Sequence, residues 1–167
     1  TNIDRDTAPH SHALEGIRAS GETLIVQSKT PVRNVVGLLP GQGHLADQYL
    51  VIGAHYDHVG MGGLGSLAPG TMEIHNGADD NASGTAVLLE VARRLASGHA
   101  TGAAEVGEQT AQATARRSII LIAFTGEERG LLGSKYFVRN PRWPLERTVA
   151  MLNMDMVGRM EGNSLTI

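Results

Sequence analysis

The sequence predicts an α/β fold in which a mainly parallel sheet is covered by helices on both faces. Three apolar runs, Tyr49–Ala54, Ser118–Thr125 and Val149–Met154, have the length and composition of strands that are buried on both sides. Apolar residues at helical spacing follow the first run, and a shorter helical segment follows the second. Strands that alternate with helices are typical of a parallel sheet between helical layers.

The segment before the first buried run carries weaker signals. Residues 1–22 are polar and irregular, with the composition of a short helix at Ala13–Ser20. Thr23–Gln27 and Val32–Leu39 are β-branched or apolar runs, separated by Lys-Thr-Pro, and the second run ends at a Pro-Gly turn signal. We therefore expect these two runs to pair as a hairpin.

Helices and loops fill the intervals between the later strands. From Ser83 onward, apolar residues recur at helical spacing for about 14 residues, which predicts a helix. Leu131–Val138 is expected to form a second, shorter helix before two prolines break the chain. The remaining segments are predicted to be a glycine-rich loop, an exposed connection and the beginning of a strand, at Gly60–Gly70, Gly98–Ala115 and Leu165–Ile167 respectively.

Composition excludes several classes of function. The chain has 167 residues, of which 41 % are hydrophobic, and a formal net charge of -3. This size fits one α/β domain, so we expect residues 1–167 to form a single domain. The slight negative charge offers no basic field, and nucleic acid is not expected as a partner. Cysteine is absent from the sequence, so any metal must be held by His and carboxylate. We find no apolar run near the roughly 20 residues of a membrane span and no signal peptide.

Polar residues cluster just past the carboxyl ends of the predicted strands. In open α/β sheets, ligands bind in the crevice beyond these ends, where neighbouring strands bring such groups together. Crowded carboxylates repel one another unless they are protonated or bound to cations. His and carboxylate without thiolate suit zinc in a hydrolytic site, with cobalt and manganese as alternatives. The pattern predicts a divalent metal centre made from His55-Tyr56-Asp57, Asp79-Asp80-Asn81, Glu127-Glu128 and Asp155.

Each cluster has a purely structural explanation when it is taken alone. His55, at the end of an apolar strand, fits a hydrogen-bonded core histidine. Residues 79–81 precede a Ser-Gly helix start and suit helix capping, and Glu127-Glu128 suits a solvated loop. Asp155 differs because it interrupts an apolar run, where an unpaired buried carboxylate would cost several kcal/mol. The position that all the clusters share favours the metal centre over these separate explanations.

Four motifs follow one another between Val32 and Gly158. They are Gly53-Ala54-His55-Tyr56-Asp57-His58, Asn76-Gly77-Ala78-Asp79-Asp80-Asn81-Ala82-Ser83-Gly84, Phe124-Thr125-Gly126-Glu127-Glu128-Arg129-Gly130-Leu131-Leu132-Gly133-Ser134 and Leu152-Asn153-Met154-Asp155-Met156-Val157-Gly158. In this order they resemble the two-zinc peptidases of metallopeptidase clan MH, which include bacterial leucine aminopeptidases, aminopeptidase Y, glutamate carboxypeptidase and the glutaminyl cyclases. The resemblance implies a three-layer α/β/α fold with a mostly parallel mixed central sheet, incomplete at the C-terminus, and two Zn²⁺ per complete site.

The resemblance also implies a role for each motif residue. His55 and Asp155 correspond to ligands of one Zn²⁺, and Glu128 corresponds to a ligand of the other. Asp80 corresponds to the carboxylate that bridges both ions. Glu127 corresponds to the general base, which acts on a metal-bridged water when an N-terminal residue is hydrolysed from a peptide.

Four further residues in or near these motifs receive lesser roles. Asp57 corresponds to the carboxylate that accepts a hydrogen bond from the other ring nitrogen of His55 and so orients the ring. Asp79 has a supporting role beside the bridging residue. His58 and His75 have no ligand role in the pattern and are expected to be loop residues beside the crevice.

The resemblance bears on the extent and location of the protein as well. The family pattern has a fifth ligand, a His well downstream of the Asp155 position, which residues 156–167 do not supply. We therefore expect the chain to be a partial peptidase catalytic domain. Thr23–Gly41 resembles the segment that follows an inserted protease-associated domain in exported members. Export to the periplasm or outside the cell, and a peptide substrate, are the corresponding expectations.

Other functions on the same scaffold remain open at this point. A glutaminyl cyclase would use one zinc to close an N-terminal glutamine, and a carboxypeptidase would read the opposite end of the peptide. A non-catalytic binding domain would keep the fold without metals, as the transferrin receptor ectodomain does. The sequence specifies neither the preferred side chain of the substrate nor the oligomeric state.

Overall fold

The computed structural model describes residues 15–63, 65–98 and 115–159, and the chain falls into two compact units. In the first unit, Thr1–Thr30, the described residues form one turn followed by irregular, exposed backbone. The helix expected at Ala13–Ser20 is absent from residues 15–20, and Thr23–Gln27 is not a strand. Both predictions are wrong because such short runs depend on burial in tertiary structure, and residues 15–30 are exposed.

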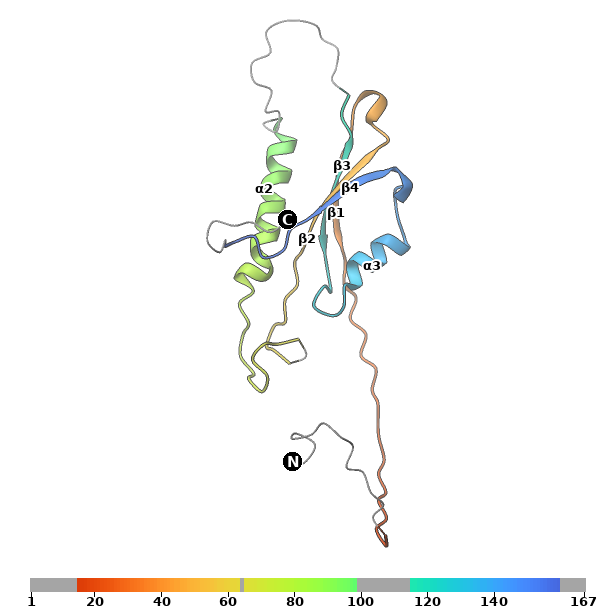
Figure 1. Cartoon of the computed structure of the whole chain (residues 1–167), viewed down its shortest axis with the longest axis vertical. Helices are drawn as coiled ribbons and strands as arrows, with labels where there is room; N and C mark the ends of the chain where they lie inside the picture. Colours follow the sequence, from red (N-terminus) through yellow and green to blue (C-terminus); the bar gives the residue numbers. More distant parts are fainter. Residues whose placement is uncertain (1–14, 64, 99–114, 160–167) are drawn as a thin grey trace, which may run out of the picture. The chain divides into compact units, whose positions relative to one another are not determined.

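The second unit, Pro31–Ile167, holds the regular elements of the described chain (Figure 1). In chain order they are β1 (Val35–Leu39), η1 (Gly43–Leu45), β2 (Tyr49–His55), η2 (Ala78–Ser83), α2 (Gly84–Ala96), β3 (Ser118–Phe124), α3 (Leu132–Arg139), η3 (Leu145–Arg147) and β4 (Thr148–Asn153). The predicted strands at β2, β3 and β4 and the two predicted helices are present with small shifts at their ends.

The four strands form one mixed sheet in the order β1-β3-β2-β4. β2 runs parallel to both β3 and β4, whereas β1 pairs antiparallel with β3. This confirms the predicted α/β class with a mostly parallel sheet. The hairpin prediction for β1 is wrong, because its partner is a distant strand: Val35 pairs with Ala123.

Parallel pairing brings three strand ends to one edge of the sheet. His55, the last residue of β2, pairs with Phe124, the last residue of β3. On the other side of β2, Gly53 pairs with Asn153, the last residue of β4. Residues that follow these three strands therefore leave the sheet at the same edge, which is where ligands bind in α/β folds.

One face of the sheet carries the hydrophobic core together with α3. Alternate residues of β2 and β3 point to this face, as the period of two in a strand requires. The buried cluster is Val51, Ile120, Ile122 and Phe124, with Tyr49, Phe137 and Trp143 packed against it. The Phe137 ring of α3 meets the Phe124 ring edge-on, with centroids 6.2 Å apart. Ile120 and Ile122 are fully buried, and truncating either to Ala would cost about 2–5 kcal/mol.

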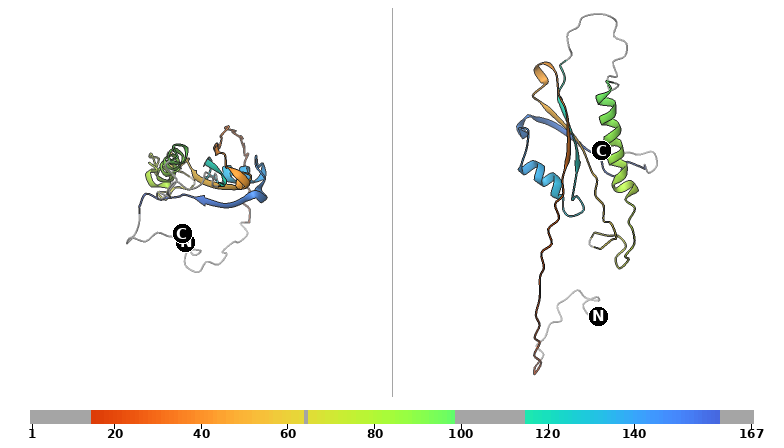
Figure 2. Two further views of the ribbon diagram at one scale, coloured as in Figure 1. Left: turned by 90° about the horizontal axis from the view of Figure 1, so that it is seen from above. Right: turned by 180° about the vertical axis from the view of Figure 1, so that it is seen from behind.

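Helix α2 lies on the opposite side of the sheet from α3, as two views of the molecule show (Figures 1 and 2). It contacts both β2 and β3 and buries Leu88. The sheet therefore lies between two helical layers in the described part of the chain. This is the predicted three-layer arrangement, and it places the first turn of α2 beside the carboxyl end of β2.

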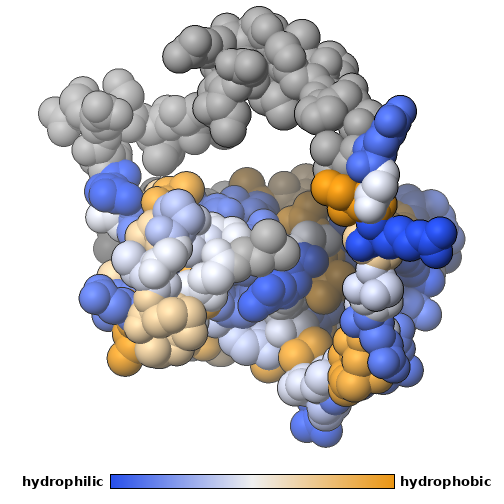
Figure 3. All heavy atoms as spheres, turned by 90° about the horizontal axis from the view of Figure 1, so that it is seen from below, coloured by the Kyte–Doolittle hydropathy of each residue, from blue (hydrophilic) through white to orange (hydrophobic). Residues whose placement is uncertain are grey.

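Strand β4 departs from the prediction that it is buried. Val149, Met151 and Leu152 are 50 %, 49 % and 66 % exposed, respectively. The reason is positional: β4 is the last strand of the sheet, and an apolar run cannot reveal whether its strand is central or at an edge. Hydrophobic residues also reach the surface beside hydrophilic ones on the face drawn in Figure 3.

Two predicted segments lie outside the described residues: most of the connection at Gly98–Ala115 and the strand at Leu165–Ile167. The predicted loop at Gly60–Gly70 has no helix or strand in its described residues. No helix in the described chain is long and apolar enough to cross a membrane.

Candidate metal centre

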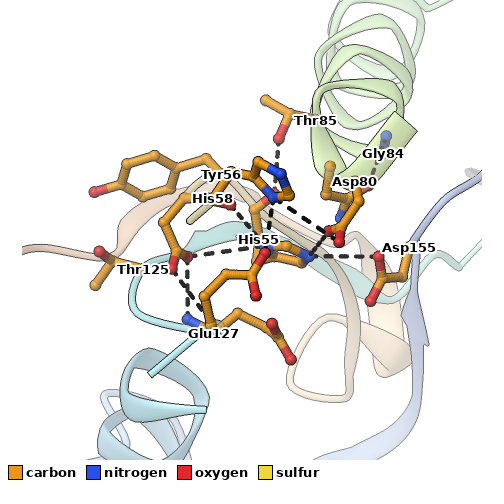
Figure 4. A network of polar contacts seen from close by, with 12 residues as sticks. His55, Tyr56, His58, Asp80, Gly84, Thr85, Thr125, Glu127 and Asp155 are labelled. Carbon is orange, nitrogen blue, oxygen red and sulfur yellow. Dashed lines mark hydrogen bonds and ion pairs between the residues drawn. The ribbon is translucent and has the colours of Figure 1, made fainter. Parts of the chain in front are cut away.

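The polar clusters singled out in the sequence gather at the carboxyl edge of the sheet (Figure 4). His55 ends β2, Glu127 and Glu128 follow β3, and Asp155 follows β4. Asp80 lies in η2, the irregular turn that leads into α2, where its backbone angles are not helical. The functional side chains thus come from the carboxyl ends of β2, β3 and β4 and from the turn that precedes α2.

His55 faces two carboxylates from separate segments. Its Nε2 atom lies 3.1 Å from Asp80 Oδ1 and 3.4 Å from Asp155 Oδ1. The ring is buried, with only 2 % of the residue exposed, whereas the Asp155 side chain is 45 % exposed. The expectation of a buried Asp155 is therefore wrong, because the segment after β4 lies at the sheet edge. The ligand atoms of all three residues lie within 4.8 Å of one another.

The other ring nitrogen of His55 fixes the orientation of the ring. Its Nδ1 lies 3.1 Å from the main-chain carbonyl oxygen of Asp57 and 3.8 Å from the carboxylate Oδ1 of the same residue. The hydrogen bond is thus made to the main chain, not to the carboxylate as the resemblance implied. Because a carbonyl oxygen can only accept, Nδ1 carries a proton and donates it. The lone pair for a cation is left on Nε2, which faces the carboxylates.

The carboxylate of Asp57 holds the loop after β3 instead. Its Oδ1 accepts the backbone N–H of Glu127 at 3.0 Å, and its Oδ2 accepts that of Glu128 at 3.3 Å. A carboxylate that receives two successive N–H groups pins both residues at once. Asp57 therefore positions the two glutamates through their main-chain N–H groups.

A second group of donors contains a residue that the sequence did not single out as a ligand. His58 Nδ1 lies 2.8 Å from Glu128 Oε1 and 3.9 Å from Asp80 Oδ2. These three residues also have ligand atoms within 4.8 Å of one another. Asp80 thus contributes one oxygen to each group, Oδ1 toward His55 and Oδ2 toward His58. The signal that could have identified His58 is its position three residues after His55.

Asn81, for which the sequence suggested a helix-capping role, also fixes the segment that carries Asp155. It is 2 % exposed, and its Nδ2 donates to the carbonyl oxygen of Met154 at 2.9 Å. Its Oδ1 accepts the N–H of Gly84 at 3.0 Å and that of Met156 at 3.3 Å. One side chain therefore joins η2, the first turn of α2 and both neighbours of Asp155. The contact with Gly84 is the local cap that the sequence suggested, whereas the contacts with Met154 and Met156 are long-range and leave no local signal.

Asp79 reinforces the same junction from its exposed side. Its Oδ1 accepts the N–H of Gly158 at 2.8 Å, and its Oδ2 pairs with Arg159 Nε at 2.7 Å. Although desolvation acts in the other direction, these donors hold the pKa of the Asp79 carboxyl below its usual value. Asp79 therefore supports the Asp155 segment, and it belongs to neither donor group.

The charges of the cluster shift two pKa values. Burial lowers the pKa of His55, but the negative charges of Asp155 and Glu127, together with hydrogen bonds to Asp57 and Asp155, raise it overall. Burial raises the pKa of Glu127; His55 opposes this, and the charges of Glu128 and Asp155 add to the increase. Neighbouring carboxylates contribute to both increases, and a bound cation would relieve this negative charge.

The donor set fits divalent cations. In its neutral form, His55 presents a lone pair to two carboxylate oxygens, so acceptors face acceptors unless a proton or a cation lies between them. Each donor group combines one imidazole with two carboxylates, which are donors that zinc accepts. Three protein ligands leave a coordination position open for water or substrate, as catalytic zinc sites do.

An α/β sheet with such donors at its carboxyl edge defines a candidate metal-dependent hydrolase. The model of peptidase family M28 matches residues 34–166. The chain belongs to this family, the zinc aminopeptidase family of clan MH, which confirms the resemblance seen in the sequence.

Curated relatives are similar over most of this chain. "Leucine aminopeptidase 1" of Arthroderma otae is 31 % identical over 131 residues, which are 77 % of this chain and 30 % of that protein. "Leucine aminopeptidase 1" of Trichophyton equinum is 29 % identical over 147 residues, 87 % of this chain and 34 % of that protein. "Probable glutamate carboxypeptidase LAMP1" of Arabidopsis thaliana is 34 % identical over 136 residues, which are 81 % of this chain and 16 % of that protein. The chain spans about a third or less of these relatives.

A solved structure resembles the fold. The crystal structure of the glutaminyl cyclase of Porphyromonas gingivalis has a TM-score of 0.51 and 26 % sequence identity. The match covers 75 % of this chain and 40 % of the cyclase. This likeness supports the α/β fold described above.

Proposed function

We propose that the intact protein is a zinc-dependent aminopeptidase whose metal centre is built largely from this chain. The observation that carries the proposal is the division of the Asp80 carboxylate between two donor groups, one with His55 and one with His58. Membership of a peptidase family supports hydrolysis of peptide bonds, and relatives named leucine aminopeptidase support attack at the N-terminal residue.

We assign the metal ligands as the resemblance implies. His55 and Asp155 would hold one Zn²⁺, Glu128 would hold the other, and Asp80 would contribute to both. When bound, the two ions would acidify a water molecule and polarise the scissile carbonyl. In support, the His55 ring is held by the main chain of Asp57 with Nε2 directed at Asp80 and Asp155.

Glu127 is the general base in this proposal. Its carboxylate takes a proton from the attacking water and returns it to the leaving amine, a role that typically contributes about 10²–10⁴-fold to the rate. Two observations support the assignment. The pKa of Glu127 is raised by burial and by neighbouring carboxylates, which suits a base that works near neutral pH. Its backbone is also held by Asp57, which keeps the side chain beside the donor groups.

Replacing Glu127 by Gln in the intact protein tests this role. The amide keeps the shape of the side chain but cannot take a proton, so we expect turnover of leucyl anilides to fall by at least about 100-fold. Bound zinc, measured by elemental analysis, should stay at the wild-type amount. Glu146→Gln is the matched control, because Glu146 lies in η3 and in neither donor group. Near-normal turnover of Glu127→Gln would remove Glu127 from the mechanism.

Two other activities have a specific observation in their favour. One structural match is a glutaminyl cyclase, and one relative is named as a glutamate carboxypeptidase. Parallel assays on a leucyl anilide, a peptide with N-terminal glutamine and a peptide with C-terminal glutamate separate the three reactions. The aminopeptidase proposal requires the first substrate to be turned over fastest. A protein that binds no zinc and turns over none of the substrates would be a binding domain.

The proposal extends to the organisation and location of the protein. We propose that residues 1–167 are a single, partial catalytic domain in which residues 1–22 are an irregular lead-in; the irregular backbone of residues 15–22 supports this. Export follows from the resemblance alone. Fractionation of cells that express the intact protein tests it, because an exported enzyme would be found in the periplasm or the medium.

A further inference from the structure

We propose that His58 is a ligand of the second cation, through Nδ1, alongside Asp80 and Glu128. The proposal rests on the metal centre proposed above and adds a residue to which the resemblance gives no ligand role. It follows from three observations: the distances around Nδ1, the slot in which the ring lies, and the contrast with a neighbouring histidine.

The distances place an imidazole nitrogen between two carboxylates. His58 Nδ1 is 2.8 Å from Glu128 Oε1 and 3.9 Å from Asp80 Oδ2, and the three residues come from three separate segments of the chain. His55 has the same relationship to the other oxygen of Asp80 and to Asp155. Each histidine therefore presents one nitrogen to one oxygen of Asp80 and to one further carboxylate. This correspondence suggests two cations with equivalent donor sets.

The ring of His58 lies in a slot formed by the backbone of Gly77. Gly77 has φ of +61°, and a Cβ atom there would approach His58 Cδ2 and Cγ to 2.9 Å. A residue other than glycine would therefore be strained and would displace the ring from this position. Gly77 precedes η2, which carries Asp80, so the backbone next to Asp80 also sets the position of His58.

His75 shows that proximity alone does not give this arrangement. Its ring centroid lies 6.4 Å from that of His58, yet both of its nitrogens are engaged elsewhere. Nε2 is 2.7 Å from Ser66 Oγ, and Nδ1 is 2.9 Å from the carbonyl oxygen of Glu73. Of these two loop histidines, His58 directs a nitrogen at carboxylates and His75 does not. His75 is therefore a matched control.

The simpler alternative is that His58 only donates a hydrogen bond to Glu128. The two roles predict different results for Asn, whose amide can donate from a position close to that of Nδ1 but is a poor ligand for zinc. If His58 is a ligand, Ala and Asn weaken the second cation alike. If it only donates a hydrogen bond, Asn restores binding that Ala loses.

The experiment is a titration of the intact, metal-free protein with Co²⁺, followed by calorimetry and by the visible absorption of the bound ion. Wild type should bind two ions. His58→Ala and His58→Asn should each weaken one of the two sites at least about 10-fold and change its absorption spectrum, since even a supporting group contributes about 10–100-fold to affinity. His75→Ala should match wild type. Circular dichroism and thermal unfolding of each variant show whether it is folded.

The possible outcomes separate the two proposals. Wild type that binds fewer than two ions overturns the proposed metal centre. Two ions in wild type, with both affinities and spectra unchanged in His58→Ala, overturn only the role of His58. Affinity that is lost in Ala and restored in Asn assigns His58 to hydrogen bonding and likewise overturns the ligand role.

Discussion

Asp80 Oδ1 lies 3.1 Å from His55 Nε2, although the two residues belong to different elements, η2 and β2. The other oxygen of the same carboxylate faces His58. A single side chain therefore connects both donor groups, and its removal should affect both, whereas removal of Asp155 should affect one.

The first prediction compares these two residues. Asp80→Ala in the intact protein should lose both zinc ions, and Asp155→Ala should keep one, because Asp155 belongs to a single donor group. Elemental analysis after dialysis against dilute zinc gives the number of zinc ions bound per protein molecule. Asp47→Ala is the control, since Asp47 is an exposed partner of Arg147. Two ions retained in Asp80→Ala would contradict the bridging role.

The second prediction concerns Asp57. Asp57→Asn keeps the main-chain carbonyl that orients His55 but leaves only one oxygen for the N–H groups of Glu127 and Glu128. Hydrogen bonds to charged groups contribute about 1.5–3 kcal/mol each, and partial exposure reduces this. We expect the Glu127 and Glu128 amides to exchange with solvent roughly 10-fold faster in the metal-free variant. Hydrogen exchange by NMR measures this rate.

The result separates two roles of Asp57. If the carboxylate mainly orients His55, as the resemblance implies, cation affinity falls in Asp57→Asn while the two amides keep their wild-type exchange rates. If the carboxylate mainly holds the N–H groups of Glu127 and Glu128, these two amides exchange faster in Asp57→Asn, and a cation still binds at His55. The Leu121 amide, in the middle of β3, serves as the internal control.

The third prediction concerns Asn81. Asn81→Ala leaves the N–H groups of Gly84 and Met156 and the carbonyl of Met154 without this partner. Because each buried polar group without a partner costs about 1–3 kcal/mol, we expect a loss of at least about 2 kcal/mol in the free energy of unfolding. Urea denaturation measures the loss. Asn140→Ala is the control, because Asn140 is exposed and bonds only within its own helix end. Equal stability of the two variants would contradict the role of Asn81 as a structural node.

The fourth prediction is the pH dependence of the metal-free protein. The pKa values of His55 and Glu127 are both raised in the folded state, so the folded protein binds protons more tightly than the unfolded chain does. The unfolded values are about 6.5 for His and about 4.3 for Glu. These contributions to stability are complete below the unfolded values and are lost as pH rises through the folded ones. We therefore expect the urea midpoint in EDTA to fall from pH 5 to pH 8.

Two comparisons check the origin of this pH dependence. His55→Asn should remove the part of the decrease that begins near pH 6.5. Saturating zinc should reverse the trend, because protons compete with the cation for His55 and weaken its binding as pH falls. Asp79 has a lowered pKa, so its contribution to stability is complete throughout this pH range and is lost only at more acidic pH. A metal-free midpoint that rises between pH 5 and pH 8 would contradict the assignment.

The sequence was sufficient for elements whose signal is local. The apolar runs of β2 and β3 and the helical spacing of α2 depend on composition and period, and the structure has all three. The sequence was insufficient where the outcome depends on a distant partner. β1 pairs with β3 instead of forming a hairpin, and β4 is exposed because of its place at the edge of the sheet. Neither fact is encoded within the strand itself.

The same distinction applies to the candidate metal centre. Strand ends that carry His and carboxylate predicted which side chains would meet, because parallel strands end at a common edge. The contacts of His58 with the carboxylates and of Asn81 with the Asp155 segment were not predicted, since they arise from tertiary structure. His58 depends on a slot beside Gly77, and Asn81 depends on backbone groups that follow β4.

The register of β2 with its two neighbours has a consequence for how the protein folds. His55, Asp80 and Asp155 approach one another only when β2 has paired with β4, two strands that are far apart in the chain. The unfolded chain therefore has no preformed site, and a cation that binds the native state alone shifts the folding equilibrium. At a free concentration of 100 times Kd, each such cation adds about 2.7 kcal/mol to the free energy of unfolding. Zinc availability during synthesis would thus influence how much of the protein reaches its native state.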